Sequence, residues 1–185
     1  MDSFKPFDQI TSVDKQHLFL QKMGGKEMDL PSHHHTLKAI QLHTGVPQII
    51  RGQFNIARNM ALYSYFFYSL GSEVQLKACS VIEHALRIKA NRPELMLRQL
   101  LILANDKNWL MDSGFRHIEK PGESRGYCKS LERVLPHLRN ESAHGVPPLV
   151  WDCISHIERC ADLVNQLFPQ VCKSGQYLLA VELRR

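Results

Sequence analysis

The sequence has few of the features that mark exported or membrane-embedded proteins. Its five cysteines include no C-x-x-C pair, so the pattern supports neither a disulfide framework nor a thiolate zinc site. The first ten residues, MDSFKPFDQI, contain no apolar stretch of the kind that a secretory signal needs. The most apolar segment, residues 60–70, is interrupted by tyrosine and serine and is too short to span a bilayer. We therefore expect a cytoplasmic protein that is neither exported nor membrane-embedded.

Several motifs of known enzyme classes are also missing. The sequence contains no Walker loop, no G-x-G-x-x-G, no G-x-S-x-G and no H-E-x-x-H. Nucleotide hydrolysis, dinucleotide chemistry, serine-esterase and zincin activities are therefore without support, and we expect no cofactor. The histidines at 33–35 and His43 suggest a metal site, but adjacent histidines diverge and no carboxylate or cysteine completes the ligand set. We expect solvated loop histidines and no metal.

The composition is that of one ordinary folded domain with an additional arm or tail. The chain has 185 residues, of which 44% are hydrophobic and 22% charged, which is enough apolar material for a core. Lysine and arginine (23) outnumber aspartate and glutamate (18), for a formal net charge of +5. This excess suits an anionic partner without requiring one, because the basic residues are scattered along the chain.

Apolar residues recur at helical spacing along most of the chain, and we predict an all-α fold, an antiparallel bundle of about five helices with an N-terminal helical arm. We assign residues 1–46 to the arm, 47–172 to the bundle and 173–185 to a C-terminal tail. Gly71 should end the first bundle helix and Ser72 should cap the second. The predicted helices span residues 12–23 in the arm and 47–71, 72–92, 93–106, 125–145 and 150–168 in the bundle, with a loop over 111–126 and a possible short strand over 176–183.

The junction between the last two predicted helices carries the most informative residues. Asn140 follows Arg139 directly, and His144 stands four residues after Asn140, before Gly145. If the helix continues to His144, Asn140 and His144 share a face, while Arg139 lies about 100° around the helix. Imidazole has an ordinary pKa of about 6.5, which suits proton transfer to or from a ribose hydroxyl, and arginine offers bidentate donors to a phosphate.

A purely structural role for the same residues is the alternative. Arg139 would then pair with Glu141 or bond the last carbonyls of its helix, and His144 would be a helix-terminal residue favoured by the helix dipole. Upstream, Glu83 and Arg87 are four residues apart and suit an ordinary i, i+4 ion pair, which we favour over a contact from Glu83 to Arg139 or to an interfacial histidine.

The pattern Arg139-Asn140-x-x-x-His144-Gly145, together with the upstream segment IEHALR at 82–87, resembles the HEPN domain superfamily. The resemblance covers roughly residues 47–171 and implies a helical bundle that cleaves RNA without metal, at a site composed by two subunits of a homodimer. It implies that Arg139, Asn140 and His144 are the catalytic residues and that Glu83 and Arg87 support them. Other members have lost catalysis and bind ligands, or are partners of nucleotidyltransferase antitoxins. The alternative is therefore a non-catalytic module that binds a nucleotide or a protein.

Overall fold

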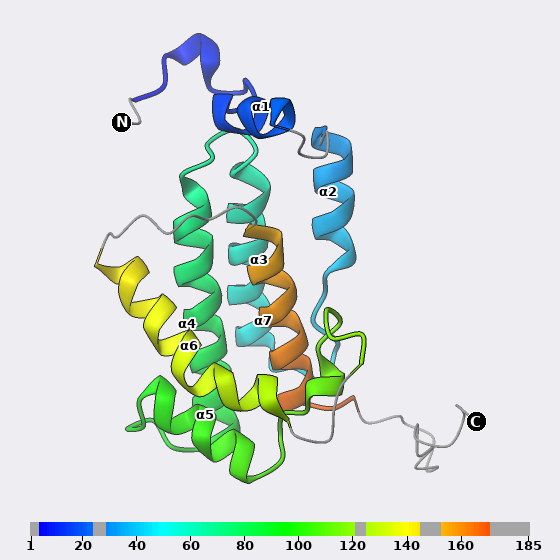
Figure 1. Cartoon of the computed structure of the whole chain (residues 1–185), viewed down its shortest axis with the longest axis vertical. Coiled ribbons are helices and arrows are strands. Elements are labelled where there is room, and N and C mark those ends of the chain that lie inside the picture. The colour runs from blue at the N-terminus through cyan, green and yellow to red at the C-terminus, as the bar shows by residue number, and fades with distance from the viewer. Residues whose placement is uncertain (1–3, 24–28, 121–124, 145–152, 171–185) are drawn as a thin grey trace, which may run out of the picture.

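The computed structural model describes residues 4–23, 29–120, 125–144 and 153–170, and all regular secondary structure within these ranges is helical. This confirms the predicted all-α class. The predicted strand over 176–183 and the junction residues 145–152 lie outside the described residues. In chain order the α-helices are α1 (Lys15–Lys22), α2 (Leu30–Ala39), α3 (Gln48–Tyr63), α4 (Leu70–Ala90), α5 (Leu97–Asp106), α6 (Gly126–Ala143) and α7 (Cys153–Leu167) (Figure 1).

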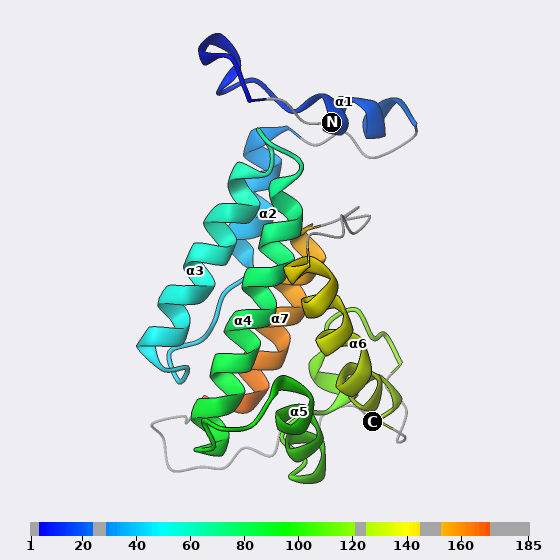
Figure 2. The ribbon, with the colours of Figure 1, turned by 90° about the vertical axis from the view of Figure 1, so that its left-hand side faces the viewer.

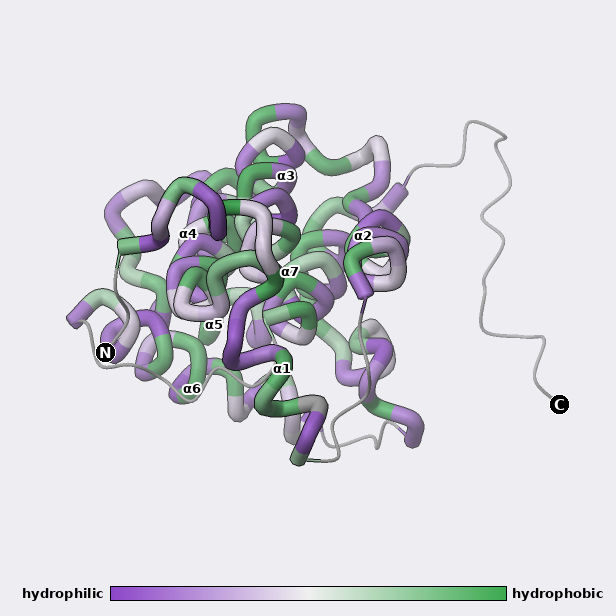
Figure 3. The backbone as a smooth tube through the Cα atoms, turned by 90° about the horizontal axis from the view of Figure 1, so that it is seen from above, coloured by the Kyte–Doolittle hydropathy of each residue, from purple (hydrophilic) through white to green (hydrophobic). Residues whose placement is uncertain are grey.

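The core is built around α4 and α7, which lie side by side and run in the same direction (Figures 1 and 2). The thiol of Cys160 lies 3.6 Å from the carbonyl oxygen of Ala78, which fixes the register of the pair. Seen from above, α7 lies between α2, α3 and α4 (Figure 3). The prediction of an antiparallel bundle is thus correct for α3 and α4 and wrong for α4 and α7, because α5 and α6 intervene and α6 runs back along α4 in the opposite direction (Figure 1).

The break between the first two bundle helices lies earlier in the chain than predicted. The first ends at Tyr63, and α4 begins at Leu70, so Gly71 is buried in the first turn of α4 rather than ending a helix, and Ser72 is not its cap. The turns between them are held by Asp14 of the arm, which donates its backbone N–H to the Tyr65 carbonyl (3.1 Å) and accepts from the Tyr68 N–H (3.0 Å).

Helix α2 was not predicted from the sequence, because its first half is mostly polar. Asp29 caps this helix by accepting the Ser32 N–H at 2.7 Å, and Pro31 occupies its first turn, where a missing N–H costs nothing. The expectation of solvated loop histidines is wrong for His33, which is buried in α2 with its ring nitrogen Nε2 2.8 Å from the Ala61 carbonyl oxygen. Leu37 adds its side chain to the same core as the bundle helices, as do Ile40 and Val46.

The start of α6 depends on groups that precede it in the chain. Buried Asp112, in the short 3-10 turn η2 (Asp112–Gly114), accepts the N–H groups of Tyr127 (3.1 Å) and Cys128 (2.9 Å), which have no partner within the helix. From there α6 crosses α4 obliquely and ends at Ala143, with Pro136 in its interior. Within the described ranges, no helix is long and apolar enough to cross a membrane.

Candidate functional site

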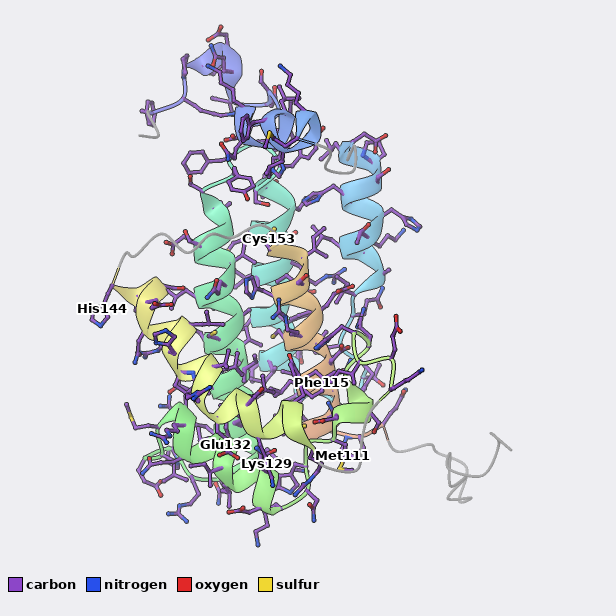
Figure 4. The ribbon with its side chains drawn as sticks, viewed as in Figure 1. Met111, Phe115, Lys129, Glu132, His144 and Cys153 are labelled. Atoms are coloured by element: carbon purple, nitrogen blue, oxygen red, sulfur yellow. The ribbon has the colours of Figure 1, made fainter. Side chains whose placement is uncertain are left out.

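The predicted catalytic residues lie together at the C-terminal end of α6. The guanidinium of Arg139 donates from Nη1 to the side-chain oxygen of Asn140 at 3.2 Å. The helix persists to Ala143, and the backbone N–H of His144 bonds the carbonyl oxygen of Asn140 at 3.0 Å, so Asn140 and His144 share a face. The His144 side chain is exposed and points away from the bundle (Figure 4).

The structure agrees only in part with the alternative in which Arg139 and His144 have a purely structural role. Arg139 forms no ion pair with Glu141 within the described residues; Glu141 instead lies 3.3 Å from the ring of His137. His144 does occupy the C-cap position of α6, as that alternative requires. Arg139 is half-buried, and its positive charge opposes the rise that burial causes in the pKa of Cys79 on α4, which reaches about 11.

Two further residues belong to the same exposed face of α6 and were missed in the sequence. Arg133 and His137 are exposed and precede Asn140 and His144 at intervals of four, three and four residues, which brings all four within one narrow stripe of the helix. We call these four residues the α6 stripe. The 4-3-4 spacing could have been found in the sequence, but the same spacing also describes any solvated helix face.

Glu83 and Arg87 are not part of this stripe. Arg87 Nη2 lies 2.6 Å from Glu83 Oε1, and Arg87 Nε donates to the Leu95 carbonyl at 3.4 Å. Glu83 is only 9% exposed and forms no ion pair with Arg139 within the part of the chain that the structure describes. The predicted i, i+4 ion pair is confirmed, and it joins the end of α4 to the loop before α5.

We expect the Glu83→Ala substitution to lower the free energy of unfolding by about 1.5 to 3 kcal/mol, because it leaves a half-buried arginine without its charged hydrogen-bond partner. Urea unfolding measures the loss. The matched control is Glu94→Ala, which removes a carboxylate paired with Arg92 on the surface, where such pairs contribute little. Equal, small losses in both variants would show that the Glu83–Arg87 pair does not stabilise the fold.

Neither a metal site nor a known relative accounts for the motif. Among residues 4–23, 29–120, 125–144 and 153–170, no three histidine, cysteine, aspartate or glutamate side chains cluster as a metal ion requires. Comparison with protein-family models, curated proteins and solved structures found no match. The α6 stripe and Arg139 are therefore the features of the structure that bear on function.

Proposed function

We propose that this protein is a metal-independent endoribonuclease of HEPN type whose active site forms between two copies of the chain. The observation that carries the proposal is the arrangement at the end of α6: an arginine held beside Asn140, and an exposed histidine one turn further on the same face as Asn140. Donors of this kind on an exposed helix face suit a phosphate and the hydroxyl groups that flank it.

In the proposed reaction, the ribose 2′-oxygen attacks the adjacent phosphorus and the bond from phosphorus to the 5′-oxygen breaks. One His144 takes the proton of the 2′-hydroxyl, and the His144 of the second copy gives a proton to the leaving 5′-oxygen. Arg139 stabilises the charge that builds on the non-bridging phosphate oxygens, and Asn140 holds the guanidinium in place. The products carry a 2′,3′-cyclic phosphate and a 5′-hydroxyl, and no water or metal is consumed.

The need for two histidines supports a homodimer with a two-fold axis near the end of α6. A single chain supplies one His144, and a two-fold axis brings the same residue of a second copy to the same site. The protein also exposes apolar residues on α3, where Ile49, Ile56 and Tyr63 are 58%, 53% and 60% exposed. Helix α3 lies on the opposite side of the bundle from α6 (Figure 2), so an interface on α3 would not complete the proposed site.

The test is incubation of the purified protein with mixed RNA in EDTA, with the oligomeric state measured by light scattering on the same sample. We expect a dimer that cuts RNA and leaves 2′,3′-cyclic phosphate ends, because neither proton transfer needs a metal. Intact RNA in the presence of a confirmed dimer would contradict the proposal and favour the non-catalytic binding module. Cleavage that EDTA abolishes would contradict the proposed chemistry.

A further inference from the structure

A cavity of about 170 Å³ lies between α4, α6 and α7, separate from the exposed α6 stripe. It exists because α6 packs on α4 and α5 and diverges from α7. Most of its wall is apolar, with leucines of α6 facing Ile82 of α4 and Leu163 of α7. An apolar cavity of about 150 Å³ is large enough to bind one benzene ring. The space therefore matches a small molecule with one ring or a short chain, and a nucleotide is too large for it.

Five polar side chains line this cavity, those of Gln75 on α4, Tyr127 and Ser130 on α6, and His156 and Arg159 on α7. Because Ala78 faces Cys160 and the two helices are parallel, Gln75 and His156 both lie about one turn nearer the helix starts. Arg159 precedes Cys160 by one residue and is half-buried. The polar groups of α4 and α7 therefore lie within about one turn of each other along the cavity, and Arg159 is also hydrogen-bonded with Tyr127 of α6.

One of these side chains, that of Gln75, has an unmet hydrogen bond within the described residues. Gln75 is 2% exposed, and its amide nitrogen Nε2 is buried without a hydrogen-bond partner. Such a buried, unpaired donor is costly to a folded protein and is rarely kept without a role. Arg159 donates from Nε to the Ser155 carbonyl at 3.0 Å and is hydrogen-bonded with Tyr127, but it forms no ion pair in the described part of the chain.

The rest of the cavity adds no negative charge. None of the described residues that line it is aspartate or glutamate, and the nearby acids of α7, Glu158 and Asp162, pair with Arg116 at 3.6 Å and 2.8 Å. Burial raises the pKa of the Cys79 thiol to about 11 and raises the pKa of Tyr127, so both stay neutral at physiological pH. The cavity is therefore mostly apolar with one cationic group, Arg159, and none of its described lining residues is a counter-ion.

We propose that this cavity binds a small organic carboxylate, with its ring or short chain against the apolar wall and its carboxylate on Arg159 and the amide of Gln75. A neutral hydrocarbon would leave the amide without a hydrogen-bond partner and the guanidinium without a counter-ion, and inorganic phosphate would leave the apolar wall unfilled. A carboxylate of one-ring size provides a counter-ion, a hydrogen-bond acceptor and an apolar surface, since arginine binds carboxylates through paired N–H donors. The proposal does not depend on RNA cleavage.

Isothermal titration of the full chain with phenylacetate and hexanoate tests the proposal, with 2-phenylethanol as the uncharged counterpart of phenylacetate. We expect at least one of the two acids to bind, and the alcohol to bind about tenfold more weakly or not at all, which corresponds to about 1.4 kcal/mol. The Arg159→Gln variant should lose affinity for the acid about tenfold, whereas the control Arg98→Gln, on the exposed face of α5, should keep it. Absence of binding by both acids, or equal binding of acid and alcohol, would overturn the proposal.

A second variant separates a binding role of Gln75 from a structural one. Gln75→Leu removes the unpaired amide, so the ligand-free variant should unfold at a higher temperature than wild type while its affinity for the acid falls. Differential scanning fluorimetry with and without the bound acid gives both results. Retention of wild-type affinity by both Arg159→Gln and Gln75→Leu would place the acid elsewhere on the protein and overturn the assignment of this cavity.

Discussion

RNA cleavage by the His144→Ala variant is expected to be about 10²- to 10⁴-fold slower than cleavage by the wild-type protein, the usual contribution of a positioned general acid or base. The loss should appear in kcat rather than in KM, because His144 would move protons in the transition state while Arg139 binds the phosphate. In the proposed composite site both the acid and the base are His144, so one substitution removes both and this range is the smallest loss that we expect. Initial rates on a short fluorescent RNA, measured in EDTA, give the comparison.

The same variant should fold as the wild type does. The His144 side chain is exposed, and its structural contribution to the end of α6 comes from its backbone N–H, which alanine retains. Surface substitutions of this kind change the free energy of unfolding by about 0.5 kcal/mol or less. His35→Ala, an exposed histidine on α2, is the matched control and should cleave at the wild-type rate. Wild-type activity in His144→Ala would exclude His144 as a catalytic residue.

The largest expected loss of stability follows from Asp112→Ala, at about 2 to 4 kcal/mol. The buried carboxylate of Asp112 accepts the backbone N–H groups of Tyr127 and Cys128, and alanine would leave both donors without a partner at the start of α6. Urea unfolding at neutral pH measures the difference. Asp29→Ala, which removes an exposed cap from α2, is the control and should cost clearly less. Equal losses would show that the Asp112 bonds contribute no more than a surface cap.

Asp112 also makes the free energy of unfolding depend on pH in the acid range. Burial alone would raise its pKa, but the hydrogen bonds from Cys128 and Tyr127 and the charge of Arg125 outweigh it, and the pKa lies below its ordinary value of 3.8. A carboxylate with a lowered pKa in the folded state stabilises the fold above the unfolded-state pKa and loses that contribution as the pH falls through the folded-state pKa. The stability difference between wild type and Asp112→Ala should therefore shrink below pH 3.8.

The sequence predicted the features of this protein that depend on neighbouring residues. The helix that bears Arg139, Asn140 and His144 was located correctly, because its apolar spacing is regular and its end is marked by glycine and proline. The Glu83–Arg87 ion pair was also predicted, since both residues lie on one helix. In each case the partners are within four residues of each other, where helical geometry alone brings side chains together.

Other features depend on contacts between distant residues, which no local pattern contains. The break between α3 and α4 is held by Asp14, which lies 54 residues before Tyr68 in the chain. The direction of α7 relative to α4 is set by the route of the chain through α5 and α6, and periodicity carries no information on direction. The α6 cap by Asp112 comes from 16 residues before Cys128. The cavity beside Gln75 and Arg159 likewise arises from three helices that the sequence cannot orient.

Pro136 interrupts the backbone hydrogen bonding in the middle of α6. Proline lacks the N–H that would bond the carbonyl of Glu132, and its ring crowds that carbonyl, so the two halves of α6 are only weakly coupled. The first half is held by the Asp112 carboxylate and by buried Leu131, whereas the second half, which bears Arg139 and His144, has no residue that is fully buried. Local unfolding follows such differences in burial. We therefore expect the last two turns of α6 to unfold locally before its first half does, while the core stays intact.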